Sequence, residues 1–567
     1  MKTAGSPAQG QWALGHREPL NAAEQAKRED DGLNVRARIE GVYARGGWGS
    51  IWPSDLRNRF RWYGLYTQRP ESDGYFMLRI RVPGGILTAG QTDVIGAISG
   101  RYGRDVADVT DRQNIQLHWI RIEDVPEIWR RLEAVGLSTT EACGDTPRNI
   151  LGCPLAGIDA SEVVDASAVL REANAQLVGN PEFSNLPRKF KISLSGCSHR
   201  CAQHEINDVG LVGALSQEGK PGFDLWVGGG LSTNPIFASR LGVFVGIEDV
   251  VPVVLGVTSV FRDWGYRKAR NRARLKFLVQ DWGPEKFRHM LQKEIGFVLP
   301  DLEEASVPAS AHREHVGTWP QKDGRNYVGF ALKAGRISGH QLRALARLAN
   351  NYGHGRIRTT TQQKMVILDV APERTPQLVE ELDVLDLPAR ASNWRRGTMA
   401  CTGIEFCKLA IVETKGRAAE IYQHLDRAVP GYEDEIRINV NGCPNSCARF
   451  QVADIGLMGC LVTEKTHNGA PDGGTRKVEA FLVHLGGHLG QTRSFGRKVK
   501  GVKILASEAG PYVETLVRRF RAGRIEGESF SAFVNRLSDE ELQRFGSKPS
   551  FGRMTPAPAA LAQPRAS

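Results

Sequence analysis

The fold is decided by Met399-Ala400-Cys401-Thr402-Gly403-Ile404-Glu405-Phe406-Cys407-Lys408 and, further along, Asn441-Gly442-Cys443-Pro444-Asn445-Ser446-Cys447. These segments hold two cysteine pairs, with gaps of five and three residues inside the pairs. Four thiolates are the ligand set of a cubane iron–sulfur cluster, whereas a zinc ribbon usually repeats a short, similar spacing on both sides. Buried core cysteines, another alternative, give no reason for two tight pairs. The spacing therefore predicts a [4Fe–4S] cluster bound by Cys401, Cys407, Cys443 and Cys447.

The sequence also contains an internal duplication. A shift of 246 positions (437 minus 191) lays residues 191–202 over residues 437–448, and the match continues through 208–211 over 454–457. The same shift places Cys443 and Cys447 over Cys197 and Cys201 of the first half. Repeats of this length indicate two half-molecules related by a pseudo-twofold axis, not a solenoid.

Each half divides into a smaller and a larger unit. The smaller unit comes first and is predicted to form strand, helix and strand, with alternating apolar residues in the strands and a 3.6-residue period in the helix. The larger unit mixes strands and helices. An arm of mixed polarity precedes the first half, and a Pro/Ala-rich tail, which we expect to be disordered, follows the second. The expected boundaries are 1–74 for the N-terminal wrapping arm, 75–137 and 320–388 for the smaller units, 148–300 and 397–540 for the larger units, and 547–567 for the tail.

Composition narrows the class of protein. Of the 567 residues, 41% are hydrophobic and 24% are charged, which is typical of a soluble globular protein with several domains. No apolar run approaches the roughly 20 residues of a membrane helix. The N-terminus lacks a secretory signal or a transit pattern, so we expect a cytoplasmic protein. Nine cysteines, an odd number grouped in motifs, favour metal or redox chemistry over disulfides.

The charge balance concerns possible partners. The net charge is +11, from 74 basic and 63 acidic residues. This surplus fits nucleic acid binding, a solvated basic surface or a docking face that steers in an acidic electron carrier. The third interpretation agrees best with the predicted cluster. The glycines at 228–230 match neither the G-x-G-x-x-G nor the Walker A pattern, so electrons must come from another protein.

Four further segments carry a family likeness: Gly10-Gln11-Trp12-Ala13-Leu14-Gly15-His16-Arg17, Gly64-Leu65-Tyr66-Thr67-Gln68-Arg69, Leu186-Pro187-Arg188-Lys189-Phe190-Lys191 and Trp226-Val227-Gly228-Gly229-Gly230. Together with the cysteine motif, they make the chain resemble the siroheme-containing sulfite and nitrite reductases from about residue 11 to about residue 530. The likeness is strongest to the single-chain ferredoxin-dependent sulfite reductases.

The resemblance implies an α+β, three-domain, pseudo-twofold duplicated siroheme reductase fold. Two ferredoxin-like half-domains and two larger α/β cofactor-binding domains would hold the siroheme at their junction. Cys447 would also ligate the siroheme iron. The implied activity is the six-electron reduction of sulfite to sulfide in assimilatory sulfur metabolism, with electrons from a ferredoxin. The implied protein is a monomer that binds neither nucleic acid nor a membrane.

Such a reaction needs a nest of cations that holds a small anion and supplies protons. Arg suits multidentate contact, and the pKa of Lys can fall far enough for it to release a proton. By position in the family motifs, the resemblance implies that Arg79, Arg148, Lys189 and Lys191 hold the substrate. Arg81 shares a strand face with Arg79, and its role is open between this clamp and contact with a siroheme carboxylate.

The carboxylates of siroheme need many donors as partners. Candidates lie on a polar strand, on its duplicate and ahead of the cluster loop, although polar residues alternating along a strand also fit a solvated sheet face. The candidates for binding siroheme are Arg112, Gln113, Asn114, Gln116 and His118 in the first half, Thr360, Thr361, Gln362, Gln363 and Lys364 in the second, and Arg395 and Arg396 before the loop.

Two other functions stay open. A ferredoxin–nitrite reductase has the same cofactors and cluster motif, but the nitrite enzymes that resemble this chain place Asn where Lys191 stands. Lys191 therefore favours sulfite, a doubly charged anion. The second alternative is a redox-sensing or electron-carrying iron–sulfur protein without siroheme, whose absorption spectrum would lack haem bands.

The first half holds cysteines of its own. The resemblance places Cys143 near the siroheme edge beside Tyr66, and we expect these two residues to pack together or to be covalently linked. Cys143 and Cys153 also lie upstream of Cys197 and Cys201, at positions that roughly match the first cluster pair. A second cluster is one alternative, but the nine-residue gap between Cys143 and Cys153 favours a reduced remnant of the duplication at Cys197 and Cys201.

Overall fold

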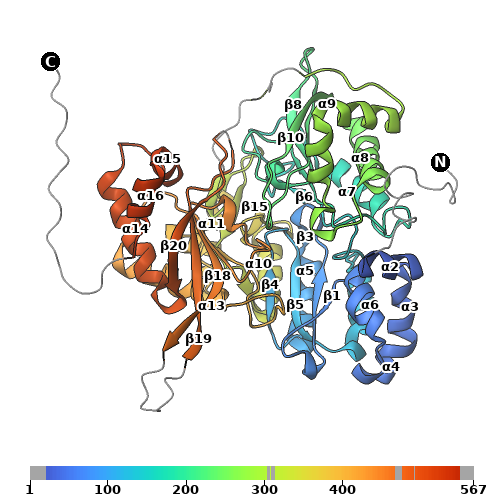
Figure 1. The fold of residues 1–567 in the computed structure, drawn as a ribbon, viewed down its shortest axis with the longest axis horizontal. Coiled ribbons are helices and arrows are strands. Elements are labelled where there is room, and N and C mark those ends of the chain that lie inside the picture. Colours follow the sequence, from blue (N-terminus) through green and yellow to red (C-terminus); the bar gives the residue numbers. More distant parts are fainter. Residues whose placement is uncertain (1–20, 303–306, 308–312, 466–474, 491, 549–567) are drawn as a thin grey trace.

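The chain forms four five-stranded sheets, two in each half (Figure 1). The computed structural model describes residues 21–302, 307, 313–465, 475–490 and 492–548. Its mixture of helices and sheets confirms the predicted α+β class and the duplicated architecture. The predicted tail lies outside the described residues from position 549 onward.

A helical arm precedes the first sheet. Its helices are α2 (Ala22–Glu29), α3 (Val35–Arg38) and α4 (Ala44–Gly46). Asn21 begins α2, because its side-chain oxygen accepts two backbone N–H groups of the first turn. Glu24 then pairs with Arg267, Nη1 to Oε2 at 3.0 Å, and both side chains are buried. This ion pair anchors the arm to the first large unit.

Each small sheet takes one edge strand from the other half of the chain. Strand β13 pairs antiparallel with β4, and β3 pairs antiparallel with β14. Backbone hydrogen bonds therefore join the two halves. The first sheet has the order β1 (Leu65–Thr67), β2 (Phe76–Ile80), β5 (Ile115–Ile120), β4 (Ala107–Val109), β13 (Arg336–Ile337), and the second has the order β11 (Gly317–Pro320), β12 (Asn326–Phe330), β15 (Met365–Val370), β14 (Arg356–Thr359), β3 (Ile86–Thr88).

Two helices of the small sheets pack directly on each other, α5 (Ala89–Tyr102) and α10 (Gly339–Tyr352). Both begin with the same Ser/Thr and Gln capping box, as the duplication requires. At their closest approach a Cβ on Gly339 would lie 2.5 Å from the Gly96 carbonyl oxygen, so the crossing depends on glycine. The shorter helices α6 (Val125–Glu133) and α11 (Thr375–Val384) contact α5 and α10.

The two large sheets repeat one topology. In each, three strands are parallel and two further strands continue the sheet antiparallel. The strands in spatial order are β6 (Leu151–Gly152), β7 (Ile192–Ser195), β8 (Val209–Leu215), β9 (Pro221–Val227), β10 (Ser239–Val245) in the first half and β16 (Thr398–Ala400), β17 (Ile438–Asn441), β18 (Ile455–Lys465), β19 (Thr475–Leu485), β20 (Arg497–Leu505) in the second. The helices are α7 (Ser167–Leu177), α8 (Val250–Trp264) and α9 (Leu275–Ile295), then α12 (Asn393–Gly397), α13 (Lys415–Ala428), α14 (Ala509–Gly523), α15 (Phe530–Arg536) and α16 (Asp539–Phe545).

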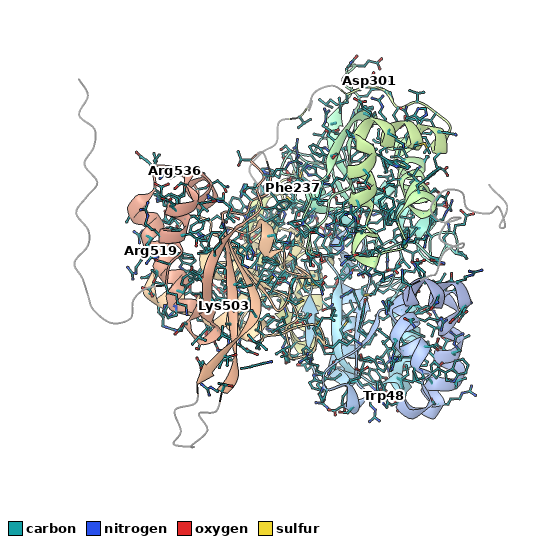
Figure 2. The ribbon with its side chains drawn as sticks, viewed as in Figure 1. Trp48, Phe237, Asp301, Lys503, Arg519 and Arg536 are labelled. Carbon is teal, nitrogen blue, oxygen red and sulfur yellow. The ribbon has the colours of Figure 1, made fainter. Side chains whose placement is uncertain are left out.

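The large units meet through a small apolar cluster. Phe237, labelled in Figure 2, stacks on Phe495 with ring centroids 3.9 Å apart. The pair packs against the buried residues Ile206, Leu231, Val452 and Leu489, which come from both halves. The contact fixes the loops of one large sheet relative to those of the other. Within the described residues, no helix is long and apolar enough to cross a membrane.

Candidate functional site

The four motif cysteines lie on loops that gather at one end of the second large sheet. Cys401 follows β16, and Cys443 and Cys447 follow β17, its parallel neighbour. Because the carboxyl ends of parallel strands meet at the same edge of a sheet, these loops converge. The Gly442 N–H donates to Cys401 Sγ at 3.2 Å. Cys407 forms a backbone bridge with Gln68, so the first half also supports the loop.

The bend of the first cysteine loop depends on a glycine. Gly403 has φ +76°, and a Cβ there would lie 2.5 Å from Thr414 Oγ1. The same hydroxyl donates to the Cys401 carbonyl oxygen at 2.7 Å. Thr414 thus holds the loop in a conformation that only glycine enters without strain.

Cys447 differs from the other motif cysteines, since its side chain is exposed whereas Cys443 is buried. Desolvation by the surrounding protein and the Cys401 thiolate raise the pKa of the Cys447 thiol to about 12, and Lys189 opposes them. A thiol with such a pKa stays protonated at neutral pH until a metal ion displaces its proton. Metal binding at Cys447 would therefore release this proton.

Two of the four predicted substrate cations, Arg79 and Lys189, interact electrostatically with Cys447, and Arg148 acts on Lys189. Arg79 lies on β2, Arg148 follows the Cys143 loop, and Lys189 and Lys191 directly precede β7. Cys447 is among the charges that act on both Arg79 and Lys189. Cations of the first half thus face a cysteine of the second.

These lysines have strongly perturbed pKa values. Burial, followed by repulsion from Arg274, lowers the pKa of Lys189 to about 7, although Cys447 partly opposes the shift. Burial and the neighbouring Arg112 and Lys189 charges lower the pKa of Lys191 well below its usual range. The Lys189 ammonium group can therefore release its proton near neutral pH, and the Lys191 ammonium group releases its proton more readily than an ordinary lysine does.

The cations of the site lack the carboxylate partners that their neighbours have. Arg188 pairs with Asp145 at 3.5 Å and Arg274 with Asp208 at 2.8 Å. Among the residues that the structure describes, no such ion pair involves Arg79, Arg148, Lys189 or Lys191. Asp111 acts on Arg79 and Lys191 but forms no ion pair with either of them, and cations grouped in this way favour binding of an anion.

Gln116 fixes the orientation of Arg79. Its side-chain oxygen accepts from Arg79 Nε at 3.2 Å and Nη2 at 2.6 Å, and its nitrogen donates to Thr402 Oγ1 at 3.2 Å. Thr402 directly follows Cys401. Gln116 therefore connects the substrate cations to the cluster loop.

Tyr66 and Cys143, which the sequence predicts to be neighbours, both lie beside Arg79. Arg79 Nη1 donates to Cys143 Sγ, and the guanidinium carbon lies 6.0 Å from the centroid of the Tyr66 ring. Burial, followed by the Cys143 thiolate, raises the pKa of Tyr66 to about 12. The three side chains form one group at the edge of the cation site.

The predicted siroheme donors have different environments. Arg112 is next to Lys191, and its guanidinium donates to Asn207 Oδ1 at 2.9 Å and to the Asn149 carbonyl oxygen at 2.6 Å. Burial lowers its pKa to about 9. Gln113 instead donates to backbone carbonyls of both halves, including that of Thr359 at 2.9 Å. Gln113 thus connects the first small sheet with the second.

His118 has a structural environment. Its Nε2 lies 2.9 Å from Asp108 Oδ2, and its ring stacks on Phe406, with centroids 3.8 Å apart. Asp108 also accepts from Arg336 Nε at 2.8 Å. The structure thus places His118 behind the cluster loop, beside Phe406, and not among the substrate cations.

Arg395 and Arg396 lie on α12 and pair with carboxylates. Arg395 Nη1 is 2.7 Å from Asp386 Oδ1, and Arg396 Nη2 is 2.7 Å from Glu314 Oε2. Arg396 and Glu314 line a cavity of about 470 Å³ in the second half, together with Gln362. Both arginines are thus held by carboxylates, and Arg396 lines this cavity.

Arg81 lies near one of the substrate cations, because burial and the charge of Arg148 lower its pKa to about 10. It is buried, and its Nη1 donates to the carbonyl oxygens of Glu141 and Pro147 at 2.9 and 3.0 Å. Its Nη2 donates to Asn174 Oδ1 at 3.0 Å. The structure thus engages Arg81 in holding the loop before Arg148.

Siroheme is a macrocycle with carboxylates, so a site that fits it should contain buried hydrogen-bond donors that have no partner within the protein. Among the described residues, Arg112 Nε, Arg449 Nε and Asn441 Nδ2 are buried and make no hydrogen bond. Asn441 and Arg449 flank the Cys443–Cys447 loop in the sequence. Four sulfur donors, a surplus of cations and unpartnered donors are together the chemistry that an iron–sulfur cluster and a siroheme require.

Sequence reasoning missed two residues of this site. The charge of Arg274 lowers the pKa of both Lys189 and Lys191, and Arg274 pairs with Asp208. Asp111 acts on Arg79, Lys191 and Cys447. Arg274 lies in no motif, so only the structure could identify it. Asp111 directly precedes the predicted donor Arg112, which was the available signal.

Known proteins match the chain over most of its length. Residues 143–299 and 391–548 match the family described as nitrite and sulphite reductase 4Fe-4S domain, and residues 68–135 and 319–385 match the nitrite/sulfite reductase ferredoxin-like half domain. A sulfite reductase [ferredoxin] of Mycobacterium tuberculosis is 48% identical over 94% of this chain and 98% of its own. An assimilatory ferredoxin-dependent nitrite reductase of Haloferax mediterranei is 38% identical over 90% of this chain and 91% of its own. The solved structure of the Mycobacterium tuberculosis NirA protein superposes with a TM-score of 0.88 at 48% identity, covering 94% of this chain and 99% of that one.

Proposed function

The chain belongs to the family of nitrite and sulphite reductases with a 4Fe-4S domain, and on that premise we propose that it is a ferredoxin-dependent sulfite reductase. The substrate is sulfite, the product is sulfide, and six electrons arrive one at a time from a ferredoxin. The observation that carries the proposal is the electrostatic interaction of Cys447 with Arg79 and Lys189, two cations that form no ion pair with a carboxylate among the described residues. These two cations provide an anion site beside a metal-binding thiol.

The motif cysteines and the cations have different roles in this proposal. Cys401, Cys407, Cys443 and Cys447 would hold the cluster, and Cys447 would also hold the siroheme iron. When bound, the cluster and the siroheme supply the electrons to the sulfur atom of the substrate. All other steps depend on side chains of this chain.

The cations bind the substrate and move protons. Arg79 and Arg148 contact the sulfite oxygens with fixed, permanently charged groups. Lys189 and Lys191, whose pKa values are lowered, give protons to the oxygens that leave as water. Gln116 keeps Arg79 in position through its two hydrogen bonds.

Lys191 supports sulfite over nitrite. A doubly charged anion gains more from a second ammonium group than a singly charged one does. The level of identity agrees with this preference, at 48% to the sulfite reductase and 38% to the nitrite reductase. Nitrite reduction by the same site is the second candidate activity.

The cluster loop suits a docking site for the electron carrier. Lys408 and Leu409 directly follow Cys407, and Leu409 is 61% exposed. Arg69 Nη2 donates to the Lys408 carbonyl oxygen at 2.9 Å, which fixes the loop at the surface. With a net charge of +11, the protein would attract an acidic ferredoxin.

An absorption spectrum, iron analysis and turnover with reduced ferredoxin test the proposal. We expect haem bands, about five iron atoms per chain (four from the cubane and one from siroheme), and faster turnover of sulfite than of nitrite. A broad cluster absorption without haem bands would indicate an electron-carrying iron–sulfur protein instead. Faster turnover of nitrite would assign the second activity.

In this proposal Tyr66 and Cys143 pack together or are covalently linked. Their common contact with Arg79 supports their proximity. A link between the phenol ring and the thiol removes one hydrogen from each partner, so its formation needs a two-electron oxidant such as dioxygen. Mass spectrometry of the digested protein should find the two peptides joined, with a mass two hydrogens below their sum. Two separate, unmodified peptides would leave only a packing contact.

A further inference from the structure

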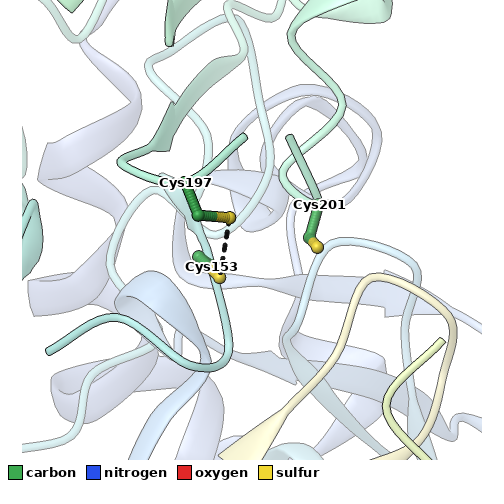
Figure 3. A group of neighbouring side chains, drawn as sticks. All are labelled: Cys153, Cys197 and Cys201. Carbon is green, nitrogen blue, oxygen red and sulfur yellow. Dashed lines mark hydrogen bonds between the residues drawn. The ribbon is translucent and has the colours of Figure 1, made fainter. Parts of the chain in front are cut away.

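Three cysteines of the first half form a compact group that the proposed reaction does not use: Cys153, Cys197 and Cys201 (Figure 3). Their three Sγ atoms lie within 4.8 Å of one another, and all three side chains are at most 3% exposed. No other set of His, Cys, Asp or Glu ligand atoms comes as close in the part of the chain that the structure describes.

The group occupies the pseudo-twofold counterpart of the cluster site. In the first half Leu151 of β6 lies opposite Ser193 of β7. In the second half Met399 of β16 lies opposite Asn439 of β17. Ser193 and Asn439 correspond under the shift of 246 residues, so Leu151 corresponds to Met399. Two residues further on, Cys153 therefore takes the place of Cys401, just as Cys197 and Cys201 take those of Cys443 and Cys447.

The spacing of the sulfur atoms differs from that of a cubane site. A tetrahedral ion with metal–sulfur bonds of about 2.3 Å places two thiolates about 3.8 Å apart. Cys153 Sγ and Cys197 Sγ are 3.8 Å apart. A cubane spreads its thiolates over four iron atoms, and a disulfide needs a separation of about 2.05 Å and leaves the third thiol unused. The distance fits one metal ion.

A buried histidine and thiolate-stabilising donors belong to the surroundings; the histidine ring nitrogens lie outside the group of atoms within 4.8 Å, so the side chain would have to move to join an ion. His315 is 3% exposed, and neither of its ring nitrogens has a hydrogen-bond partner among the described residues. The Cys197 thiolate is one of the charges that act on this ring. The His199 backbone N–H donates to Cys197, and Ser195 Oγ lies 3.8 Å from the same sulfur. Buried imidazole nitrogens without a partner are costly, and metal coordination satisfies one of them.

We propose that Cys153, Cys197 and Cys201 bind one structural divalent metal ion of the zinc class, with His315 as the fourth ligand. Three thiolates and one imidazole are an ordinary structural zinc set. The cysteines pack in one apolar cluster with Tyr327, Val366 and Leu368, which belong to β12 and β15 of the second small sheet. The ion thus fastens the first large unit to a sheet of the other half.

Metal analysis of the purified holoenzyme tests the site without any variant. We expect about one zinc per chain in addition to about five iron atoms. X-ray absorption at the zinc edge should report three sulfur ligands at about 2.3 Å and one nitrogen ligand. A zinc-free enzyme that also fails to bind added Zn²⁺, a shell of oxygen and nitrogen only, or about nine iron atoms per chain would each overturn the proposal. The last result would mean a second cluster.

Variants identify the ligands. Cys197→Ala should reduce the zinc content at least about tenfold, while iron content and haem bands stay unchanged. The matched control is Cys460→Ala, on β18 in the other large sheet, which should keep its zinc. His315→Ala should weaken zinc binding about tenfold or more, and an unchanged affinity would remove His315 from the ligand set. Zinc retained in Cys197→Ala would refute the zinc site. A variant that keeps its zinc content but loses sulfite turnover would concern the proposed reaction and not the zinc site.

Discussion

Replacing Lys189 by Arg should change the pH dependence of turnover while leaving a cation in the anion site. Burial and repulsion from Arg274 lower the pKa of Lys189 to about 7, whereas arginine stays charged at every pH of interest. A proton donor works in its protonated form, so the activity that depends on Lys189 is present below its pKa and lost above it. An unperturbed lysine would stay protonated until about pH 10.

The size of the effect follows from the same pKa. The protonated fraction of Lys189 falls from about nine tenths at pH 6 to about one tenth at pH 8. Because kcat/KM reports the ionisation of the free enzyme, it should fall about tenfold over this range. Lys189→Arg should have a lower kcat at pH 6, because the proton donor is gone, and a nearly flat profile.

The assay needs a substrate whose own charge is constant. Sulfite changes its protonation near neutral pH, whereas nitrite stays a single anion, so nitrite turnover gives the clean profile and sulfite turnover the comparison. A small artificial reductant keeps carrier docking out of the measurement. A flat wild-type profile, or an equal tenfold fall in Lys189→Arg, would refute the assignment of this proton to Lys189.

Three further changes test other parts of the structure. Cys447→Ser should lose most of the siroheme, because a hydroxyl stays protonated where a thiolate must bind two metals; normal haem bands and turnover would disprove the bridging role. Lys191→Asn should lower the ratio of sulfite to nitrite turnover, and an unchanged ratio would show that this lysine does not discriminate. Gly339→Ala should destabilise the protein by about 1–3 kcal/mol in thermal or denaturant unfolding, since its Cβ would lie 2.5 Å from the Gly96 carbonyl oxygen. The control Gly41→Ala, exposed and with no atom within 4 Å of the added Cβ, should be neutral or slightly stabilising.

The parts of the fold that could be predicted have a signal within the chain itself. The cysteine gaps identify the cluster motif, and the shift of 246 residues identifies the duplication before any strand is placed. These two inferences need only spacing and residue type. The prediction that Tyr66 and Cys143 are neighbours came from the family resemblance, and both side chains contact Arg79 in the structure.

Other features depend on pairing that spacing does not reveal. By spacing, both Cys143 and Cys153 match the first cluster pair. In the structure only Cys153 lies beside Cys197. The register in which β6 pairs with β7 places Cys153, the residue after β6, at this position. His118 stays a predicted siroheme donor, whereas its contact with Asp108, on the neighbouring strand β4, was not predicted. The sequence pattern of one strand does not show which carboxylate lies on the neighbouring strand.

The short strands β3 and β13 were equally beyond prediction, since three and two residues are too few for a period. Their exchange between the small sheets bears on the origin of the chain. One half expressed alone would lack the strand that closes its sheet and would expose an edge open to aggregation. Two copies of such a half could complete each other, which is the arrangement of a domain-swapped homodimer. The fused chain is thus built as such a dimer would be if its two subunits were joined end to end. It should fold and unfold as one cooperative body, and cutting it between the halves should yield fragments that are stable only together.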